Sequence, residues 1–350
     1  MGIALCPRRT QRSGSKGRQI LKIGTRIDPT WLDKPNDLAF LKQIGVDVVD
    51  ITLDICPGYR EAGGRANREG LQQVVERIGG AGLQVERANT FNQDCARVFL
   101  DQPGGEREIE NLQVNAELCG EFGFPVMGIQ AFQAGQVADI GDFHHYVEGR
   151  GGYRYLRMEL DEALNVPPRD EAPSPEQVWE RTLKIYRAVM PVAESAGVRI
   201  AMHGNDPPVP LLNGVHQVLH NFAAFDRLFA EVDSPNNGMT FCVGTRYESG
   251  EDVFEGIKRF GQQGKIFHVH FRNVAGTIPK DRAYAETMPD AGDLDMYQVI
   301  RALHDVGYSG AIDYDHIMKL TTDTPVGREY IAFCVGHSRG MMQALANLSA

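Results

Sequence analysis

The feature that most constrains the fold is a regular alternation of short strand-like runs with longer stretches of helical spacing. The strand-like runs are rich in β-branched or alternating apolar residues, and they cover 20–26, 46–53, 83–90, 126–132, 197–204, 238–245, 265–273 and 309–316. The stretches between them place apolar residues three and four apart, and most of them end in glycine, a usual helix stop. Strands that alternate with helices form parallel sheets, and eight such strands close into a barrel. We therefore predict an α/β fold of the (β/α)8 TIM-barrel type.

An open, doubly wound sheet is the alternative to the closed barrel. That fold would place a glycine-rich phosphate turn after its first strand. The first run here is followed by "GTRIDPTW", which contains one glycine. The closed barrel is the better interpretation.

The same rhythm predicts one catalytic domain over 19–350, with a basic leader over 1–18 and one insertion over about 133–175. The leader mixes arginine and lysine with serine and glycine, and we expect it to be flexible. The insertion far exceeds the usual loop of about two to six residues between a strand and its helix, so it predicts a lid over the active-site face. Its arginines and tyrosines, such as Arg154, suit an oxygen-rich or anionic ligand; a solvated surface or a subunit contact is the open alternative.

The net charge and the cysteine pattern indicate which kind of molecule the protein binds and where it is found. The formal net charge of −10 argues against a general nucleic-acid surface, and no run reaches the roughly 20 apolar residues of a membrane span. The six cysteines are scattered without a CxxC pair, as expected for reduced thiols in the cytoplasm. We expect a small-molecule partner, a cytoplasmic location and no nucleic-acid or membrane partner; a homo-oligomer is left open.

Metal-competent side chains stand at the ends of four successive strands. They are His203, Cys242, His270 and Asp315. Taken singly, a strand histidine is more often a hydrogen-bonded structural residue and a lone cysteine a small buried hydrophobe, but the carboxyl ends of barrel strands meet at one mouth. Because alternate residues of a strand share a face, His268 lies deeper than His270 and is expected to support it. The pattern predicts a metal site.

This donor set indicates the chemistry. Two imidazoles, one thiolate and one carboxylate suit Zn²⁺ by softness, whereas six-coordinate Mn²⁺, Fe²⁺ or Co²⁺ would keep two positions open for a hydroxy-carbonyl substrate. A metal of this kind acidifies the C–H beside a carbonyl and stabilises the enolate. The prediction is proton abstraction or β-elimination on a sugar.

One competing motif is rejected. The sequence "GHSRG" at 336–340 fits the nucleophile elbow of a serine hydrolase. In that fold an acid and a histidine follow the serine, and neither occurs after Ser338. A serine hydrolase is therefore not predicted.

Five short motifs resemble the metal-dependent mannonate dehydratases, barrel enzymes related to the xylose-isomerase-like sugar enzymes. In this sequence they read "HGNDPP" from 203, "TFCVGT" from 240, "HFRN" from 270, "GDLDM" from 292 and "DYDH" from 313. The resemblance implies that the four strand-end residues bind a metal, usually Mn²⁺, with Fe²⁺, Co²⁺ or Zn²⁺ as alternatives. It also implies that His316 is a catalytic acid/base, that Tyr330 stands at a catalytic tyrosine, and that the reaction dehydrates a sugar acid to a 2-keto-3-deoxy product.

Departures from these motifs bear on the substrate. Asp313 stands where the family has arginine, and Gly204 and Asn205 stand where it has Pro and Asp. An aspartate at the mouth would repel a carboxylate, so either Arg154 or Arg272 supplies the missing cation or the substrate is a neutral or keto sugar. The expected substrate-binding residues are Arg272, Asn273, Asn205, Asp206 and Arg154. The alternatives are an isomerase, epimerase or β-eliminating lyase on such a sugar, and a non-catalytic sugar-binding barrel.

Overall fold

The structure is a computed structural model that describes residues 21–33, 35–133, 135, 144–163 and 167–348. The predicted leader over 1–18 lies outside these residues, as does part of the predicted insertion. Among the helices described, none combines the length and the apolar character needed to cross a membrane.

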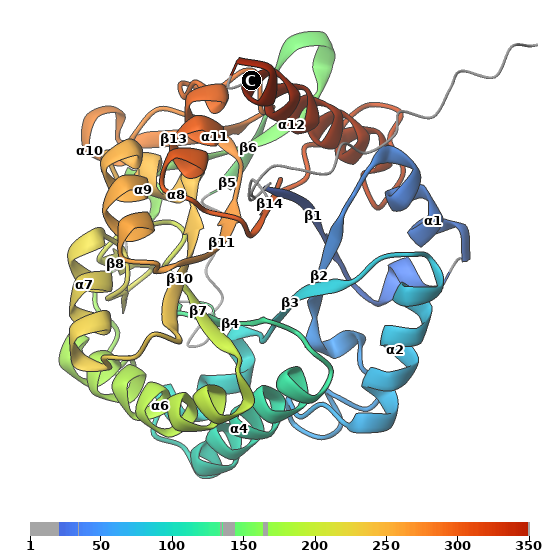
Figure 1. The fold of residues 1–350 in the computed structure, drawn as a ribbon. Coiled ribbons are helices and arrows are strands. Elements are labelled where there is room, and N and C mark those ends of the chain that lie inside the picture. The colour runs from blue at the N-terminus through green and yellow to red at the C-terminus, as the bar shows by residue number, and fades with distance from the viewer. Residues whose placement is uncertain (1–20, 34, 134, 136–143, 164–166, 349–350) are drawn as a thin grey trace, which may run out of the picture.

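In the described part of the chain, eight parallel strands close a barrel (Figure 1). They are β1 (Lys22–Ile27), β2 (Val48–Thr52), β3 (Val85–Asn89), β4 (Val126–Gln130), β7 (Arg199–His203), β10 (Asn237–Cys242), β11 (Ile266–His270) and β14 (Ala311–Asp313). The order is β1-β14-β11-β10-β7-β4-β3-β2, and β1 pairs with both β2 and β14. Each barrel strand falls within or beside one of the predicted runs, so the closed barrel is confirmed and the open sheet is excluded.

Helices form a ring outside the barrel (Figure 1). The long ones are α1 (Pro35–Ile44), α2 (Arg68–Gly80), α4 (Gly105–Glu121), α6 (Pro175–Ala196), α7 (Phe222–Glu231), α9 (Val253–Gln262), α11 (Met296–Asp305) and α12 (Arg328–Leu348). Short helical segments are η1 (Pro29–Leu32), η2 (Leu53–Ile55), η3 (Asn92–Cys95), α3 (Ala96–Phe99), η5 (Arg150–Gly152), α5 (Leu160–Ala163), α8 (Val243–Glu248) and α10 (Ile278–Asp281).

Local sequence explains where helix α6 begins and ends. The Ser174 side chain accepts a hydrogen bond from the Gln177 backbone N–H, and Pro175 occupies the first helical position. Gly197 ends the helix at a φ of 70°, a conformation that glycine adopts without steric cost. The rejected elbow motif lies inside helix α12, so Ser338 is a helical residue and not a nucleophile on a strand-to-helix turn.

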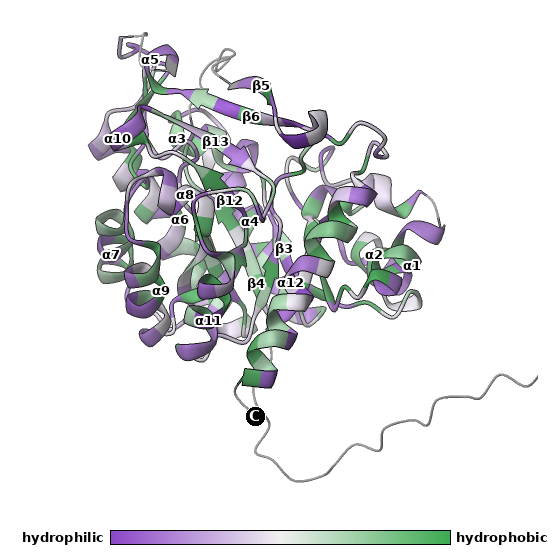
Figure 2. Cartoon of the chain, turned by 90° about the horizontal axis from the view of Figure 1, so that it is seen from above, coloured by the Kyte–Doolittle hydropathy of each residue, from purple (hydrophilic) through white to green (hydrophobic). Residues whose placement is uncertain are grey.

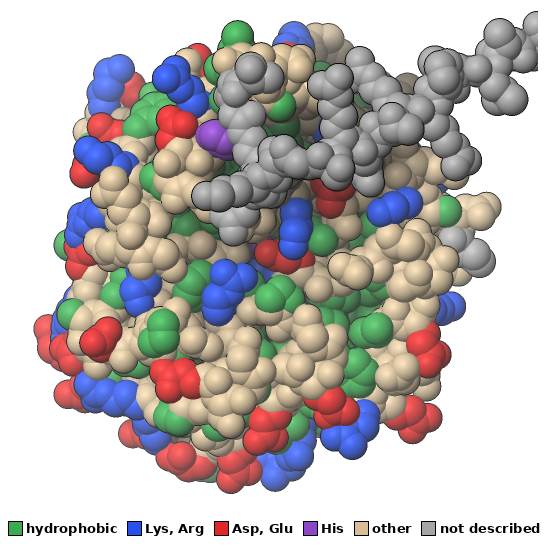
Figure 3. Space-filling view, in the orientation of Figure 1, with side chains coloured by type: hydrophobic (Ala, Val, Ile, Leu, Met, Phe, Trp, Pro, Cys, Tyr) green, Lys and Arg blue, Asp and Glu red, His purple; other side chains and the backbone are tan. Residues whose placement is uncertain are grey.

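Apolar side chains of the helices pack on the outside of the barrel, and Figure 2 shows hydrophobic residues in the barrel strands and in the helices around them. Inside the barrel, by contrast, one layer is charged: Asp50, Arg87, His268 and Asp313 are all buried there. Figure 3, viewed as in Figure 1, shows acidic and basic side chains interspersed over this face of the molecule, outside the area drawn in grey.

A second sheet lies across one end of the barrel (Figure 2). It contains β12 (Asn273–Ala275), β13 (Ala283–Thr287), β6 (Arg154–Glu159) and β5 (His144–Glu148), all antiparallel and in that order. Strands β5 and β6 come from the predicted insertion, whereas β12 and β13 follow barrel strand β11. We call this the roof sheet. A small hairpin of β8 (Leu211–Leu212) and β9 (Val215–His216) lies after β7.

Candidate active site

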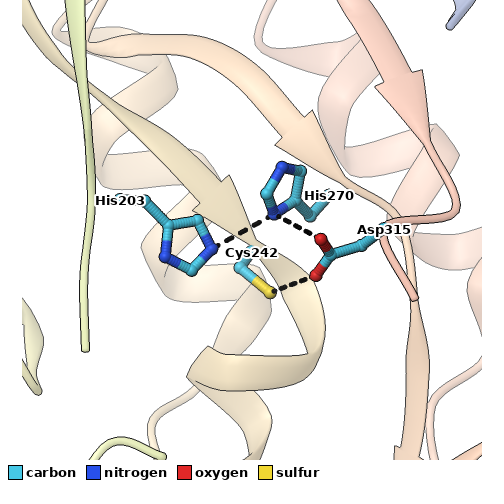
Figure 4. Close-up of side chains that lie close together, drawn as sticks. All are labelled: His203, Cys242, His270 and Asp315. Carbon is cyan, nitrogen blue, oxygen red and sulfur yellow. Dashed lines mark hydrogen bonds and ion pairs between the residues drawn. The ribbon is translucent and has the colours of Figure 1, made fainter. Parts of the chain in front are cut away.

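Four side chains from four successive barrel strands meet at the mouth of the barrel (Figure 4). His203, Cys242 and His270 end strands β7, β10 and β11, and Asp315 follows strand β14 by two residues. One ligand atom from each lies within 4.8 Å of the others, and all four residues are buried. We call this group the donor cluster. The structure brings together the four residues that the sequence predicted as metal ligands.

Strand register accounts for this convergence. Cys242 is paired with His270 across strands β10 and β11, and His270 is paired with Asp313 across β11 and β14. Beyond β14 the chain turns: Asp315 has a φ of 62°, and its backbone N–H donates to Asp313 Oδ1 at 2.9 Å. This turn carries the Asp315 carboxylate into the cluster, where its Oδ1 lies 3.2 Å from His270 Nδ1 and its Oδ2 lies 3.7 Å from Cys242 Sγ.

The donor cluster fits a divalent transition metal. Burial lowers the pKa of His203 to about 4 and holds the pKa of His270 well below its usual range, so both imidazoles are neutral and keep a lone pair. His203 Nε2 faces His270 Nδ1 at 3.1 Å. Burial raises the pKa of the Cys242 thiol to about 12, and a bound cation is what would favour its thiolate. Two nitrogens, one sulfur and one carboxylate oxygen are ligands that such a metal accepts.

Outer contacts orient these donors. His203 Nδ1 lies 2.7 Å from the Gly204 carbonyl oxygen, an acceptor that places the proton on Nδ1 and leaves Nε2 for the cluster. The Thr245 backbone N–H and hydroxyl both donate to Cys242 Sγ, the hydroxyl at 3.0 Å. Both contacts favour the form of the side chain that binds a metal.

His316 stands beside the donor cluster. Its Nδ1 lies 2.7 Å from Glu286 Oε1, and its Nε2 lies 3.6 Å from Asp315 Oδ2. Burial lowers the pKa of His316, but the carboxylates of Asp315 and Glu286 outweigh that effect and raise it to about 9. At neutral pH His316 is therefore a protonated group, and its side chain is 38% exposed.

Two adjoining cavities open beside the cluster. The inner cavity has a volume of about 250 Å³ and is lined by His203, His270, Asp315 and His316 together with Arg26 and Asp206. The outer cavity, of about 1160 Å³, is bounded by the roof sheet and is lined by Arg154 and Tyr146 among others. His316, Arg26 and Glu286 line both. The roof sheet thus covers the donor cluster, as expected for a lid, although only half of it comes from the predicted insertion.

Two of the predicted substrate-binding residues reach these cavities and three do not. Asp206 lines the inner cavity and Arg154 the outer one. Arg272 is 2% exposed and is held by Asp206, Glu248 and Asp315 at 2.6, 2.5 and 3.1 Å, so it supports the donor cluster from behind. Asn205 and Asn273 are buried and bind backbone groups.

Tyr330, predicted as a catalytic residue, is 1% exposed in helix α12. Its ring packs edge-on against Tyr314, with centroids 5.9 Å apart, and it is not among the residues that line either cavity. The described structure does not place Tyr330 next to the donor cluster.

The expectation that Asp313 presents an anion at the mouth is wrong. Asp313 is 3% exposed inside the barrel, where its Oδ2 lies 2.8 Å from His268 Nε2. Burial and Arg87 lower the pKa of His268, but Asp313 and Glu86 outweigh them and raise it to about 9. The Asp313 charge is therefore neutralised by an imidazolium. His268 lies deeper than His270, as predicted.

Two residues of the site escaped the sequence prediction. Arg26 lies near the carboxyl end of strand β1, so the strand-end argument that identified the donor cluster could have included it. Glu286 comes from β13, a strand for which the sequence showed no clear pattern, and nothing local marked it.

Comparisons with known proteins give the family. A profile of the D-mannonate dehydratase (UxuA) family matches residues 168–349. A mannonate dehydratase of Streptococcus agalactiae is 32% identical over 314 residues, which cover 83% of this chain and 86% of that protein. Mannonate dehydratase 2 of Halalkalibacterium halodurans is 35% identical over 144 residues, and this match spans 41% of each chain.

Solved structures agree on the fold. The crystal structure of mannonate dehydratase from Streptococcus suis superposes with a TM-score of 0.81 at 23% identity and covers 95% of both chains. The 3-keto-D-glucoside 4-epimerase YcjR from E. coli has a TM-score of 0.59 at 15% identity and covers 90% of this chain and 98% of that one. With the profile match over half of its length and the S. agalactiae relative aligned over most of both proteins, the chain belongs to the mannonate dehydratase family.

Proposed function

We propose that this protein dehydrates a sugar acid of the mannonate type to a 2-keto-3-deoxy acid. The observation that carries the proposal is the position of His316. His316, held by Glu286, and four metal-competent side chains border the same inner cavity of about 250 Å³. The family of the chain supports the same reaction.

The metal would be held by His203, Cys242, His270 and Asp315, and we propose Mn²⁺, the metal that the family resemblance implies; a six-coordinate ion would keep two positions open beyond these four. When bound, it supplies a Lewis acid for the charge that develops beside the substrate carboxylate. Fe²⁺, Co²⁺ and Zn²⁺ are the alternatives that metal analysis distinguishes.

His316 would act as the general acid. In the dehydration a general base takes the proton from C2, the electron pair of that C–H bond forms the C2–C3 double bond, and the C3–O bond breaks as the hydroxyl is protonated and leaves as water; the resulting enol then becomes the 2-keto group. His316 would give its proton to that hydroxyl, and Glu286, 2.7 Å from Nδ1, would fix the ring so that Nε2 faces the reacting atoms. Tyr330 has no role in this proposal because it lines neither cavity.

The alternative of an isomerase, epimerase or β-eliminating lyase on a neutral or keto sugar is not favoured. The relative that aligns over 86% of its own length is a mannonate dehydratase, whereas the epimerase YcjR shares only the fold. A cytoplasmic location and a homo-oligomeric state stay predictions.

The test is to incubate the Mn²⁺-loaded protein with D-mannonate and to follow the 2-keto-3-deoxy product. We expect turnover by the unmodified chain and a loss of about 10²- to 10⁴-fold in His316→Asn, with the metal content unchanged, because this variant removes only the proton donor. Arg107→Gln, on the exposed surface of helix α4, is the matched control. Turnover of His316→Asn at the unmodified rate would refute the assignment of the acid.

A further inference from the structure

An arginine outside the recognised motifs lies at the mouth of the barrel. Arg26 belongs to strand β1, which pairs with β14 in the register Ile23↔Ile312. Its Nη2 lies 3.1 Å from Asp315 Oδ1 and 3.1 Å from His270 Nε2. A guanidinium group thus touches two members of the donor cluster.

Arg26 is more accessible than the other arginines around the cluster. Its side chain is 33% exposed, whereas those of Arg87 and Arg272 are 0% and 2% exposed. Arg26 also lines both the inner and the outer cavity. Its Nη2 makes the hydrogen bonds to the donor cluster, and among the described residues no hydrogen bond or ion pair is formed by Nη1. Arg26 therefore keeps an unused donor group, Nη1, in a side chain that lines both cavities.

The carboxylates near Arg26 each have another cation. Asp50 Oδ2 is 3.2 Å from Arg87 Nη1 but 3.8 Å from Arg26 Nε. Asp313 is 2.8 Å from His268, and Asp315 is 3.1 Å from Arg272 Nε as well as from Arg26. Arg26 is consequently not the sole cation beside any one of them, although Arg272 shares its charge among Asp315, Asp206 and Glu248.

We propose that Arg26 binds the carboxylate of the sugar acid and thereby selects acids over neutral sugars. This inference rests on the proposed function and adds the group that recognises the acid. In the motif that "DYDH" resembles, an arginine stands at the position of Asp313. Here the aspartate is buried against His268, and the cation comes from the neighbouring strand β1.

A carboxylate held by Arg26 would be well placed for the reaction. A guanidinium presents two parallel N–H donors to a carboxylate, which fixes its orientation as well as its position. The atoms next to that carboxylate would then lie between the donor cluster and His316, both of which border the inner cavity. Arg154 lines only the outer cavity and stacks on Tyr146, with its guanidinium carbon 4.6 Å from the ring centroid, so it is the weaker candidate.

The experiment compares D-mannonate with D-mannonamide, its neutral isostere, by titration calorimetry on the Mn²⁺-loaded protein. All measurements use a His316→Asn background, so that binding is observed without turnover. We expect Arg26→Gln to weaken mannonate binding by roughly 10- to 100-fold, the loss expected when a charge-assisted contact to a carboxylate is removed, and to leave mannonamide binding unchanged. Arg26→Lys keeps the charge but loses the planar fork. Its affinity for mannonate should lie between that of the His316→Asn protein and that of the same protein carrying Arg26→Gln.

The ratio of the two affinities separates recognition from structural damage, since a distorted cavity would weaken both ligands alike. Arg107→Gln should leave the ratio unchanged, and metal content is measured for each variant. The role of Arg26 would be overturned if Arg26→Gln left the ratio unchanged, whether both affinities stayed the same or fell in parallel. It would also be overturned if the preference for mannonate were lost only in Arg154→Gln. Neither result would contradict the proposed function. Failure of mannonate to bind in the His316→Asn background would refute the proposed function together with the role of Arg26.

Discussion

At the scale of single residues, the structure explains why glycine occupies position 204, where the family motif has proline. A Cβ at Gly204 would lie 2.7 Å from the Leu219 carbonyl oxygen and 3.1 Å from the Phe225 ring. That carbonyl is fixed, because it accepts a hydrogen bond from the Asn205 backbone N–H at 2.8 Å. The Asn205 side chain closes the same loop by donating to the Phe132 carbonyl and accepting from the Leu219 N–H. Glycine and asparagine here shape the chain behind His203.

Gly204→Ala should therefore destabilise the fold. The added methyl group meets backbone that cannot move without breaking a hydrogen bond, and overpacking of this kind costs about 1–3 kcal/mol. Urea unfolding of the metal-loaded protein measures the change in free energy. An unfolding midpoint equal to that of the unmodified chain would show that the loop can relax.

At the scale of elements, helices α4 and α6 pack side by side through a glycine. A Cβ at Gly120, in the last turn of α4, would lie 2.5 Å from the Ala196 carbonyl oxygen at the end of α6. In helix α2, by contrast, nothing lies within 4 Å of the Cβ position at Gly79. The two glycines share a secondary structure and differ in their surroundings.

This pair predicts opposite signs for the same substitution. Gly79→Ala should raise the free energy of unfolding by about 0.5–1 kcal/mol, because alanine is the better helix former. Gly120→Ala should lower it by about 1–3 kcal/mol, because the close contact outweighs helix propensity. Thermal and urea unfolding of both variants decide the matter, and stabilisation by Gly120→Ala would contradict the packing described.

Elements also show what the sequence could and could not predict. The barrel strands followed from their own β-branched and alternating patterns, and the donor cluster followed from the rule that strand ends converge. The roof sheet did not, because its pairing of Ala285 with Arg157 joins segments far apart in the chain, and no local periodicity records such a partner. The contact of Glu286 with His316, the burial of Asp313 and the packing of Tyr330 away from the cavities also depend on residues far apart in the sequence. No local pattern could therefore predict them.

At the scale of the whole molecule, a buried charge network crosses the barrel. His268 of strand β11 lies 3.3 Å from Glu86, on strand β3, and 2.8 Å from Asp313 of the adjacent β14. All three side chains are almost completely buried. The imidazolium therefore links strands on opposite sides of the barrel through charge–charge contacts.

This network predicts that stability depends on pH. The pKa of His268 is about 9 in the folded chain, against about 6.5 for a histidine in an unfolded one. Its contribution is fully present below about pH 6.5 and is lost as the pH rises through about 9, on the order of 1–3 kcal/mol in total. Urea unfolding at pH 6.5 and 9.5 should show this loss in the unmodified chain and in the control His337→Gln, a partly exposed histidine of helix α12 outside the network. A His268→Gln variant with an equally large loss would exclude the network as its source.

The two origins of the roof sheet have a practical consequence for redesign. Strands β5 and β6 precede the first residue of the donor cluster, while β12 and β13 lie between His270 and Asp315, yet β6 and β13 pair edge to edge. An engineer who wishes to change which sugar enters could exchange both hairpins together, keeping Glu286 of β13 because it holds His316, and leave every barrel strand untouched. Swapping either hairpin alone would leave its counterpart with an unpaired β edge beside His316, exposing the chemistry to water.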